Sequence, residues 1–301
     1  MKILVTDGMD KTAMAALRAD GHEVIEQYYE PDQLGAALRE VDAVIVRSKT
    51  KVRAKHIDAA KGGQLKLIIR GGVGVDNIDV QYAEEAGIAV RNTPKASSQS
   101  VAELAMAHMF ACSRYVSIAG HSMRQGQWEK KAYGKGVELF GKTLGIIGFG
   151  RIGQKLCAMA KAMGMNVIAF DIFHVPGIEA QMGMEYVEMD ELFARADFIS
   201  LHTPAIDGKP LICAENIAKM KDGVIFVNTS RGNNVDEAAL LDALNSGKIR
   251  GAGLDVFADE PSANEALYSH PNVSCTPHIG AATVEAQKRI GEEIVDLIRS
   301  F

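Results

Sequence analysis

The sequence predicts an α/β protein with two domains, each built on a doubly wound parallel β-sheet. Three observations support this class. Short apolar stretches alternate with amphipathic ones along most of the chain, which is the pattern of β-strands connected by helices. The length of 301 residues is typical of two domains. A glycine-rich turn between two apolar stretches at 142–171 opens the second series of strands.

The first series covers residues 1–95 and predicts a flavodoxin-like domain. Its strands are expected at Ile3–Thr6, Val24–Gln27, Ala43–Arg47, Leu67–Arg70 and Ile88–Arg91, and its helices at Thr12–Arg18, Asp32–Glu40, Ala54–Ala60 and Val80–Glu85. The first strand is followed by Asp7–Gly8–Met9–Asp10, which lacks a repeated glycine pattern. We therefore do not expect this half to bind a dinucleotide.

A single long helix is expected at 96–120, with Ser97–Ser98 as its start, because apolar residues occupy nearly all of its faces. Residues 121–141 then form a loop that carries cationic and aromatic side chains, which are Arg124, Trp128, Lys130, Lys131, Tyr133 and Lys135. The segment is either a solvated loop or an arm that reaches a second subunit and delivers basic groups.

The second series predicts the six strands of a complete dinucleotide-binding domain. They are expected at Leu144–Ile147, Val167–Phe170, Phe198–Leu201, Val224–Asn228, Gly251–Val256 and Val273–Thr276. The amphipathic helix at 284–301 is expected to return to the first domain. One domain would then be discontinuous, 1–95 plus 284–301, and the other would be 96–283.

The turn after the first strand of this series carries G-x-G-x-x-G at Gly148, Gly150 and Gly153. Glycines also mark ordinary turns, but here a strand precedes the pattern and a helix follows it, as in a Rossmann domain. Gly148 would allow the tight turn, Gly150 the approach of a pyrophosphate, and Gly153 the close packing of helix on strand. Arg151 and Ile152 would begin the helix, whose free N–H groups face the phosphates.

Asp171 ends the second strand of the series, at the usual distance for a carboxylate that accepts the ribose hydroxyls of an adenosine. A carboxylate repels a 2′-phosphate, and no Arg or Lys follows within 172–174. The sequence therefore favours NAD over NADP.

Composition excludes several other classes of protein. The net charge of −5 and pI near 5.9 give no global basic field for nucleic acid. The four cysteines are scattered without a C-x-x-C pair, so we expect reduced thiols and no metal site. The first residues read as a strand rather than a signal peptide, and no stretch is apolar enough to cross a membrane. We expect a cytoplasmic protein.

Candidate catalytic residues follow the later strands, whose carboxyl ends meet at the sheet edge that holds the glycine turn. Arg231 would bind a substrate carboxylate and polarise the neighbouring carbonyl. His278 would exchange the hydroxyl proton, because an imidazole titrates near neutral pH. Glu260 would accept a hydrogen bond from the other ring nitrogen of His278 and favour the imidazolium. These are the groups that hydride transfer on a hydroxy acid requires.

Other residues at the same edge are expected to line the cofactor pocket: His202, Thr203, Pro204, Thr229 and Gly280. Asp255 either orients the carboxamide of the cofactor or is a buried, hydrogen-bonded structural residue. The remaining histidines have no such context, and we expect them to be structural or solvated. They are His22, His56, His108, His121, His174 and His270.

Four runs resemble the D-isomer-specific 2-hydroxy acid dehydrogenase family: GKTLGIIGFGRIG, VNTSRGNNVDEAALLDAL, GLDVFADEP and TPHIGAAT. The resemblance spans nearly the whole chain. It implies two α/β domains, a homodimer, and a catalytic set that falls on Arg231, Glu260 and His278.

Within that family, VRSKTKV, IIRGGVGVDNID and GQWEKKAYG resemble the branch that oxidises D-3-phosphoglycerate to 3-phosphohydroxypyruvate in serine synthesis. The resemblance implies that the first domain binds the substrate. The phosphate would be held by Arg47, Ser48 and Arg70, the carboxylate by the N–H groups of Val73 and Gly74, and further cations would come from Lys130 and Lys131.

Two alternatives remain open from the sequence. The same chemistry could act on another small acid, such as glyoxylate, hydroxypyruvate or D-lactate. The chain could instead be an NAD-sensing binding protein on the same scaffold, although the intact Arg231, Glu260 and His278 favour an enzyme. Because the sequence ends at Phe301, we expect no C-terminal regulatory domain of the kind many family members carry.

Overall fold

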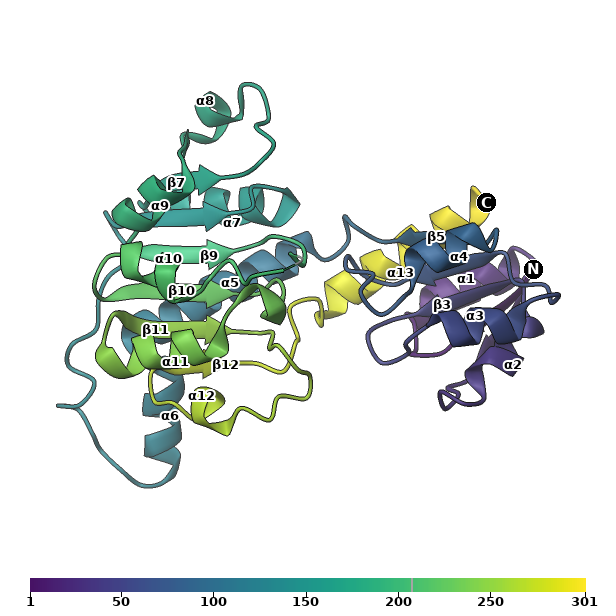
Figure 1. Cartoon of the computed structure of the whole chain (residues 1–301), viewed down its shortest axis with the longest axis horizontal. Helices are drawn as coiled ribbons and strands as arrows, with labels where there is room; N and C mark the ends of the chain where they lie inside the picture. The colour runs from purple at the N-terminus through teal and green to yellow at the C-terminus, as the bar shows by residue number, and fades with distance from the viewer. Residues whose placement is uncertain (207) are drawn as a thin grey trace. The chain divides into compact units, whose positions relative to one another are not determined.

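The computed structural model describes residues 1–206 and 208–301. The chain divides into two compact units (Figure 1). Unit 1 comprises Met1–Ser98 with Ala281–Phe301, and unit 2 comprises Gln99–Gly280. Each unit is an α/β structure around a parallel sheet, which confirms the predicted fold class.

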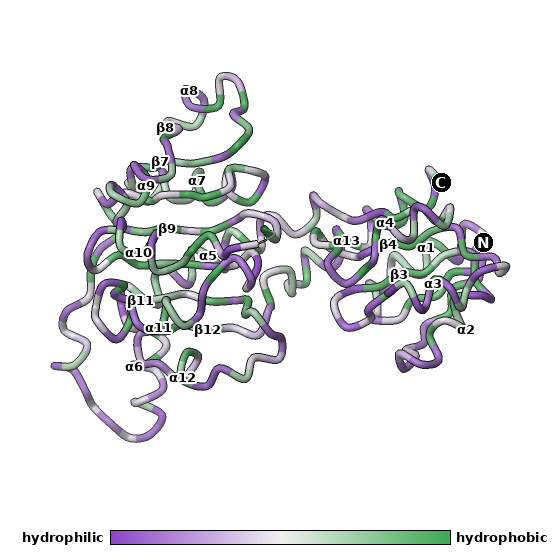
Figure 2. Tube along the Cα trace, viewed as in Figure 1, coloured by the Kyte–Doolittle hydropathy of each residue, from purple (hydrophilic) through white to green (hydrophobic). Residues whose placement is uncertain are grey.

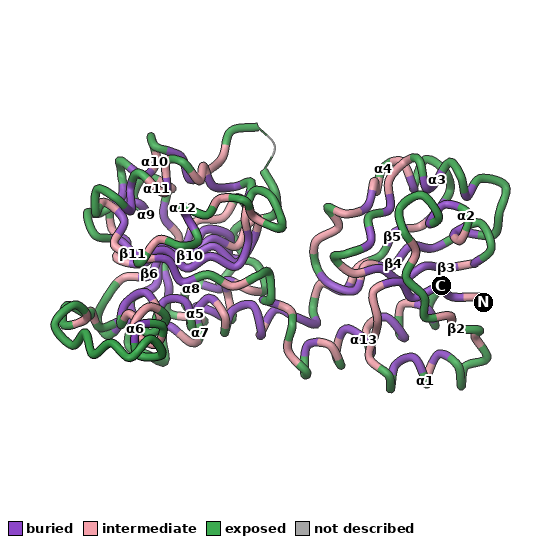
Figure 3. Tube along the Cα trace, turned by 90° about the horizontal axis from the view of Figure 1, so that it is seen from below, coloured by how far each residue is buried: buried purple, intermediate pink, exposed green. Residues whose placement is uncertain are grey.

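Unit 1 contains a five-stranded parallel sheet in the order β2-β1-β3-β4-β5, the flavodoxin-like order. Its strands are β1 (Lys2–Val5), β2 (Glu23–Glu26), β3 (Ala43–Val46), β4 (Leu67–Arg70) and β5 (Ala89–Asn92). Its helices are α1 (Lys11–Ala19), α2 (Leu34–Arg39), α3 (Ala54–Ala60), α4 (Val80–Glu85) and α13 (Val284–Arg299). In Figure 3, α2, α3 and α4 cover one face of the sheet and α1 and α13 cover the other.

The C-terminal helix α13 is amphipathic and belongs to unit 1. Thr283 caps its first turn, because the side chain accepts a hydrogen bond from Ala286 N at 3.1 Å. Its buried face packs on α1 at Gly291, where an added Cβ would lie 2.7 Å from the Cβ of Ala13. The two ends of the chain thus complete one core.

Unit 2 contains a seven-stranded parallel sheet in the order β12-β11-β10-β9-β6-β7-β8. The strands are β6 (Thr143–Ile147), β7 (Asn166–Phe170), β8 (Glu185–Tyr186), β9 (Phe198–Leu201), β10 (Val224–Asn228), β11 (Ile249–Leu254) and β12 (Val273–Cys275). The order reverses between β6 and β9, as in a Rossmann domain. The prediction of six strands missed β8, because this two-residue edge strand contains no apolar run.

The helices of unit 2 form two layers around this sheet (Figure 3). One layer comprises α9 (Met189–Arg195), α10 (Ala214–Lys219), α11 (Glu237–Ser246) and α12 (Glu265–Tyr268). The other comprises α5 (Ser98–Arg114), α7 (Arg151–Ala162) and α8 (Ile178–Met182). A short 3₁₀ helix, η1 (Gly232–Asn234), precedes α11. Figure 2 shows that hydrophobic residues concentrate in the central strands, which both layers bury.

The single helix predicted at 96–120 is wrong, because the chain forms α5 and then α6 (Val116–Arg124). Tyr115 separates them with a left-handed backbone, φ 58°. Its hydroxyl accepts a hydrogen bond from Arg250 at 2.9 Å, and its ring lies 5.9 Å from that of Tyr133. The carbonyl of Ser113 accepts from Val137 N at 2.9 Å. These contacts with distant segments stabilise the break between α5 and α6, and the helical periodicity of the sequence does not indicate them.

No helix among the described residues is long and apolar enough to span a membrane.

Candidate active site

The carboxyl ends of the parallel strands of unit 2 meet at one edge of its sheet, where β6 and β9 lie at the reversal of strand order. In open α/β sheets this edge is where ligands bind. The glycine turn follows β6, and each predicted catalytic side chain follows a later strand.

The glycine turn is shaped for a phosphate-bearing ligand. Gly148 has φ 92°, and an added Cβ would lie 2.8 Å from the carbonyl of His202. A Cβ on Gly153 would lie 2.4 Å from the oxygen of Gly148, so only glycine lets α7 approach the turn this closely. A Cβ on Gly150 would meet nothing within 4 Å. The open space at Gly150, beside the N-terminus of α7, is therefore the place a pyrophosphate can occupy.

Asp171 follows β7 and holds the glycine turn directly. One carboxylate oxygen accepts from Phe149 N at 2.6 Å, and the other accepts from Phe173 N at 2.9 Å. The neighbouring Ile172 and Phe173 side chains are 79% and 77% exposed, which provides apolar surface beside the carboxylate. This combination fits the adenosine part of a dinucleotide.

The loop after β9 is held by a residue that the sequence analysis did not single out. Asn234 is fully buried, and its amide donates to Thr203 Oγ1 at 3.0 Å and to the Pro204 carbonyl at 2.8 Å. Its side-chain oxygen accepts from Ile206 N at 2.9 Å. The available signal was the polar run Asn233–Asn234 directly after Arg231–Gly232, where no apolar pattern explains a buried residue.

His202 is the first residue after β9, and its Nε2 lies 2.8 Å from Ser200 Oγ. Burial lowers the pKa of His202 to about 4, so the ring is neutral at pH 7. A neutral ring beneath the glycine turn fits the wall of a cofactor pocket and not a proton-transfer role.

Arg231 follows β10 in a turn that Asn228 organises. The Asn228 amide donates to the Arg231 carbonyl at 2.9 Å, and its oxygen accepts from the Ser230 hydroxyl at 2.8 Å. Gly232 then passes directly against another loop, since an added Cβ would lie 1.9 Å from the carbonyl carbon of Phe257. Any side chain at Gly232 would push apart the loops that carry Arg231 and Glu260.

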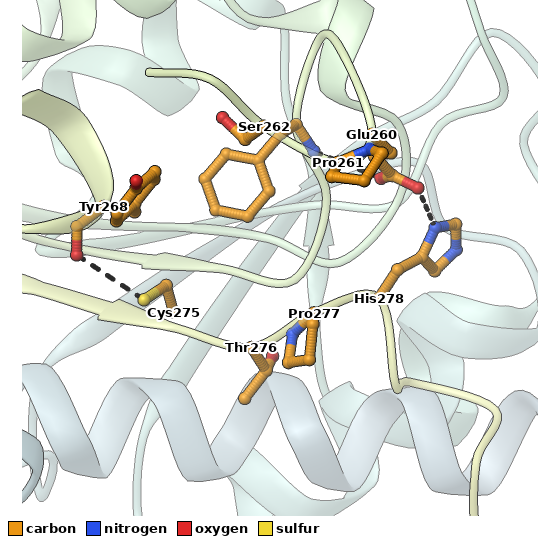
Figure 4. A pocket seen from close by; sticks show the side chains of 9 residues that line it. Glu260, Pro261, Ser262, Tyr268, Cys275, Thr276, Pro277 and His278 are labelled. Carbon is orange, nitrogen blue, oxygen red and sulfur yellow. Dashed lines mark hydrogen bonds and ion pairs between the residues drawn. The ribbon is translucent and has the colours of Figure 1, made fainter. Parts of the chain in front are cut away.

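Glu260 and His278 form a hydrogen-bonded pair, with 2.7 Å between Oε2 and Nδ1 (Figure 4). Burial alone would raise the pKa of Glu260. The hydrogen bond and charge of His278, together with Phe257 N and the charge of Arg231, hold that pKa below its usual value. Glu260 is thus a carboxylate at neutral pH, and it fixes a proton on Nδ1 of His278. A cavity of about 420 Å³ adjoins the pair and is lined by Phe257, Pro261, Ser262, Tyr268, Cys275, Thr276 and Pro277.

Asp255 is 1% exposed and holds the turn that carries His278. Its Oδ1 accepts from Thr276 Oγ1 at 2.6 Å and from Ile279 N at 2.8 Å, and its Oδ2 accepts from Gly280 N at 2.8 Å. Burial raises the pKa of Asp255, and these three donors oppose that shift. These contacts are the ones expected from the second alternative given above, in which Asp255 is a buried, hydrogen-bonded structural residue.

In unit 1, the loop after β3 carries Arg47 and is fixed by two polar side chains. The Asp7 carboxylate accepts from Arg47 N at 2.7 Å and from Thr50 N at 2.9 Å. The Asn77 amide donates to the carbonyls of Arg47 and Thr50, both at 2.7 Å. Burial lowers the pKa of Arg47. Ser48 lies exposed in this loop.

The next strand, β4, ends at Arg70, whose guanidinium folds over its own turn. It donates to the Gly71 carbonyl at 3.3 Å, and a Cβ on Gly72 would collide with it. Val73 and Gly74 follow, and the Val73 carbonyl accepts from Asn92 at 2.6 Å. Since β3 and β4 are parallel neighbours, both predicted phosphate-binding arginines lie at one sheet edge of unit 1. Lys130 and Lys131 are exposed in the loop after α6.

A family model described as "D-isomer specific 2-hydroxyacid dehydrogenase, NAD binding domain" matches residues 106–280. This segment holds the glycine turn, Asp171 and the Arg231, Glu260 and His278 loops. The chain belongs to the D-isomer specific 2-hydroxyacid dehydrogenase family.

Two curated relatives of this dehydrogenase are similar over 99% of its length. A hydroxypyruvate reductase of Thermotoga maritima is 51% identical, and the match covers 97% of that protein. A D-3-phosphoglycerate dehydrogenase of Methanocaldococcus jannaschii is 46% identical, but the chain spans only 57% of its length. Among solved structures, a D-lactate dehydrogenase from Aquifex aeolicus, complexed with NAD and lactic acid, has a TM-score of 0.86 and 30% identity, over 99% of this chain and 95% of that one.

The dehydrogenase is thus an oxidoreductase that uses NAD. The structure of unit 2 fits this cofactor, because Gly150 faces open space at the start of α7 and Asp171 stands at the end of β7.

Proposed function

We propose that this dehydrogenase interconverts D-3-phosphoglycerate and 3-phosphohydroxypyruvate, the oxidation serving serine synthesis. The single observation that carries the phosphorylated substrate is the Arg47 loop of unit 1. Its backbone is fixed by Asp7 and Asn77, and Arg70 lies on the adjacent strand. Two arginines at one sheet edge give a local cationic surface in a protein of net charge −5, and guanidinium groups suit the bidentate binding of a phosphate.

The catalytic chemistry is assigned to three side chains of unit 2. Arg231 binds the substrate carboxylate and polarises the oxygen on C2. His278 takes the hydroxyl proton on oxidation and returns it on reduction, while Glu260 holds the proton on Nδ1 and stabilises the imidazolium. NAD supplies the acceptor or donor of the hydride at C2. With Nδ1 committed to Glu260, Nε2 is the nitrogen left to face the substrate.

Further positions complete the proposal. Backbone N–H groups at Val73 and Gly74 bind the carboxylate, Ser48 assists at the phosphate, and Lys130 and Lys131 add cations. In this assignment 1–95 plus 284–301 is the substrate-binding domain and 96–283 the NAD-binding domain. The cofactor is lined by Gly148, Gly150, Arg151, Ile152, Gly153, Asp171, His202, Thr203, Pro204, Thr229, Asp255 and Gly280.

We also propose a cytoplasmic homodimer. Support for the dimer comes from apolar side chains exposed along α6 and the loop after it, where Val116 is 60%, Trp128 79% and Phe140 75% exposed.

A second candidate substrate is hydroxypyruvate itself. It is favoured by the 51% identity to a hydroxypyruvate reductase of nearly the same length. The two candidates share C1–C3 and differ only by the phosphate, so Arg47 and Arg70 decide between them.

Steady-state kcat/KM with NADH should be measured on phosphohydroxypyruvate, hydroxypyruvate, glyoxylate and pyruvate. We expect the phosphorylated acid to be preferred by at least about tenfold, which is about 1.4 kcal/mol of discrimination between transition states. Arg47→Ala should remove most of that preference while leaving hydroxypyruvate nearly unaffected. The exposed Lys55→Ala is the matched loss of one cation from unit 1 and should change neither rate. An equal loss on both substrates in Arg47→Ala would refute the phosphate role.

A further inference from the structure

A buried hydrogen-bond chain connects α5 and α6 to the turn that carries His278. His108 on α5 is 2% exposed. Its ring lies between Ser274 of β12 and Thr276 of the turn that follows β12. Its Nδ1 is 3.0 Å from Ser274 Oγ, and its Nε2 is 3.1 Å from Thr276 Oγ1. Ser117 Oγ on α6 lies 3.1 Å from Ser274 Oγ, and Thr276 Oγ1 lies 2.6 Å from Asp255.

The direction of every bond in this chain follows from its end. The Thr276 hydroxyl donates its one hydrogen to Asp255 Oδ1. The oxygen of Thr276 then accepts from Nε2–H of His108, which leaves Nδ1 as an acceptor for the Ser274 hydroxyl. The Ser274 oxygen in turn accepts from the Ser117 hydroxyl. Burial lowers the pKa of His108 to about 4, so the ring is neutral and has the one donor and one acceptor that this order requires.

The fold provides a specific place for the His108 ring. A Cβ on Gly253 of β11 would lie 2.4 Å from the Cβ of His108 and 2.9 Å from its Cγ. Glycine at this position therefore lets α5 bring an imidazole against the strand. An apolar side chain could also fill the space beside Gly253, but it would form no hydrogen bonds. Both ring nitrogens of His108 are hydrogen-bonded, so the position is built for an imidazole.

The turn that carries His278, at one end of this series of hydrogen bonds, is strained. His278 has φ 53°, a left-handed conformation that costs a non-glycine residue of order 1–3 kcal/mol and persists only where its surroundings enforce it. His278 N donates to the Asp255 carbonyl at 2.8 Å, and the Asp255 carboxylate accepts from the next two amides. The orientation of Asp255 therefore sets the orientation of His278.

We propose that His108 is a positioning residue for His278. Its neutral ring orders the Thr276 hydroxyl towards Asp255, and Asp255 holds residues 278–280 in the conformation that presents the His278 ring. The role of His278 in proton transfer belongs to the proposed function, on which this inference rests. The histidine that the sequence analysis grouped with structural ones thus contributes to the reaction without touching substrate.

The first test measures the turn without turnover. In the full-length protein, amide hydrogen exchange of His278, Ile279 and Gly280 should be at least about tenfold faster in Thr276→Val and in His108→Leu. Thr276→Val keeps the shape of the side chain, so it reports the hydroxyl even if His108→Leu folds poorly. Ser113→Ala is the matched control, since that buried hydroxyl of α5 bonds only within its helix in the described contacts. Unchanged exchange at the three amides in Thr276→Val would overturn the inference.

The second test measures catalysis. Both variants should lose about tenfold to a hundredfold in kcat, with KM for the 2-oxo acid nearly unchanged, because the proton-transfer step depends on the placement of His278. His108→Gln, which keeps a donor for Thr276, should recover part of the loss, and the double variant should be no worse than the poorer single one. Additive losses, or no rescue by glutamine, would show a merely structural histidine. If the wild type reduces no 2-oxo acid, the proposed function fails, and the exchange result still decides the role of His108.

Discussion

His278→Asn is expected to lower kcat by about 10²–10⁴-fold while NADH affinity stays nearly unchanged. Asparagine preserves a side-chain amide that can still donate to Glu260, which lies 2.7 Å from the ring in the wild type. It cannot exchange a proton near neutral pH, so only the acid–base step is removed. Steady-state kinetics and a fluorescence titration with NADH measure the two quantities separately.

His121→Asn is the matched control for that variant, because His121 is an exposed histidine of α6. It should retain full activity. Full activity in His278→Asn would mean that another group transfers the proton, and the assignment of the pair Glu260–His278 would be wrong.

Two single-methyl substitutions in the glycine turn should affect different quantities, one the binding of NADH and the other the stability of the fold. Gly150→Ala places its Cβ in open space, so stability without nucleotide should hardly change. The same methyl occupies the place assigned to the pyrophosphate, and NADH should bind at least about a hundredfold more weakly, a loss of about 2.7 kcal/mol. Gly153→Ala places its Cβ 2.4 Å from the oxygen of Gly148, which must move. We expect it to cost about 1–3 kcal/mol of folding free energy.

Denaturant unfolding without nucleotide and an NADH titration distinguish the two glycines. Gly120→Ala on α6 controls for the added methyl, because its Cβ meets only the flexible end of Arg124. It should leave both quantities unchanged or stabilise the helix slightly. Strong NADH binding by Gly150→Ala would place the pyrophosphate somewhere other than this turn.

The sheet of each unit could be predicted because parallel strands are buried on both faces and appear as short apolar runs. β4, β9 and β10 begin and end where those runs do. The same rule located the candidate site, since the carboxyl ends of parallel strands share an edge. Glu260 and His278, which are far apart from Arg231 in sequence, could therefore be grouped before any contact was known.

What the sequence did not reveal depends on contacts between distant segments. The break at Tyr115 requires Arg250 and the loop near Tyr133, and the helical pattern of 96–120 contains no sign of it. The roles of Asn234 and His108 depend on hydrogen-bond partners in distant segments of the chain. The need for glycine at position 232 could not be predicted from a sequence pattern, because it arises where the backbone of one loop packs directly against the backbone of another. The substrate phosphate stays a prediction, since it depends on Arg47 and Arg70 and not on the reaction chemistry.

Isotope transfer tests the assignment of the reaction most directly. The wild-type dehydrogenase should be given phosphohydroxypyruvate and NADH carrying deuterium at C4, in each of its two configurations, and the product analysed by mass spectrometry and chiral chromatography. We predict D-3-phosphoglycerate with deuterium at C2 from one of the two labelled forms and none from the other. An L product, label from both forms, or no deuterium at C2 would contradict the account.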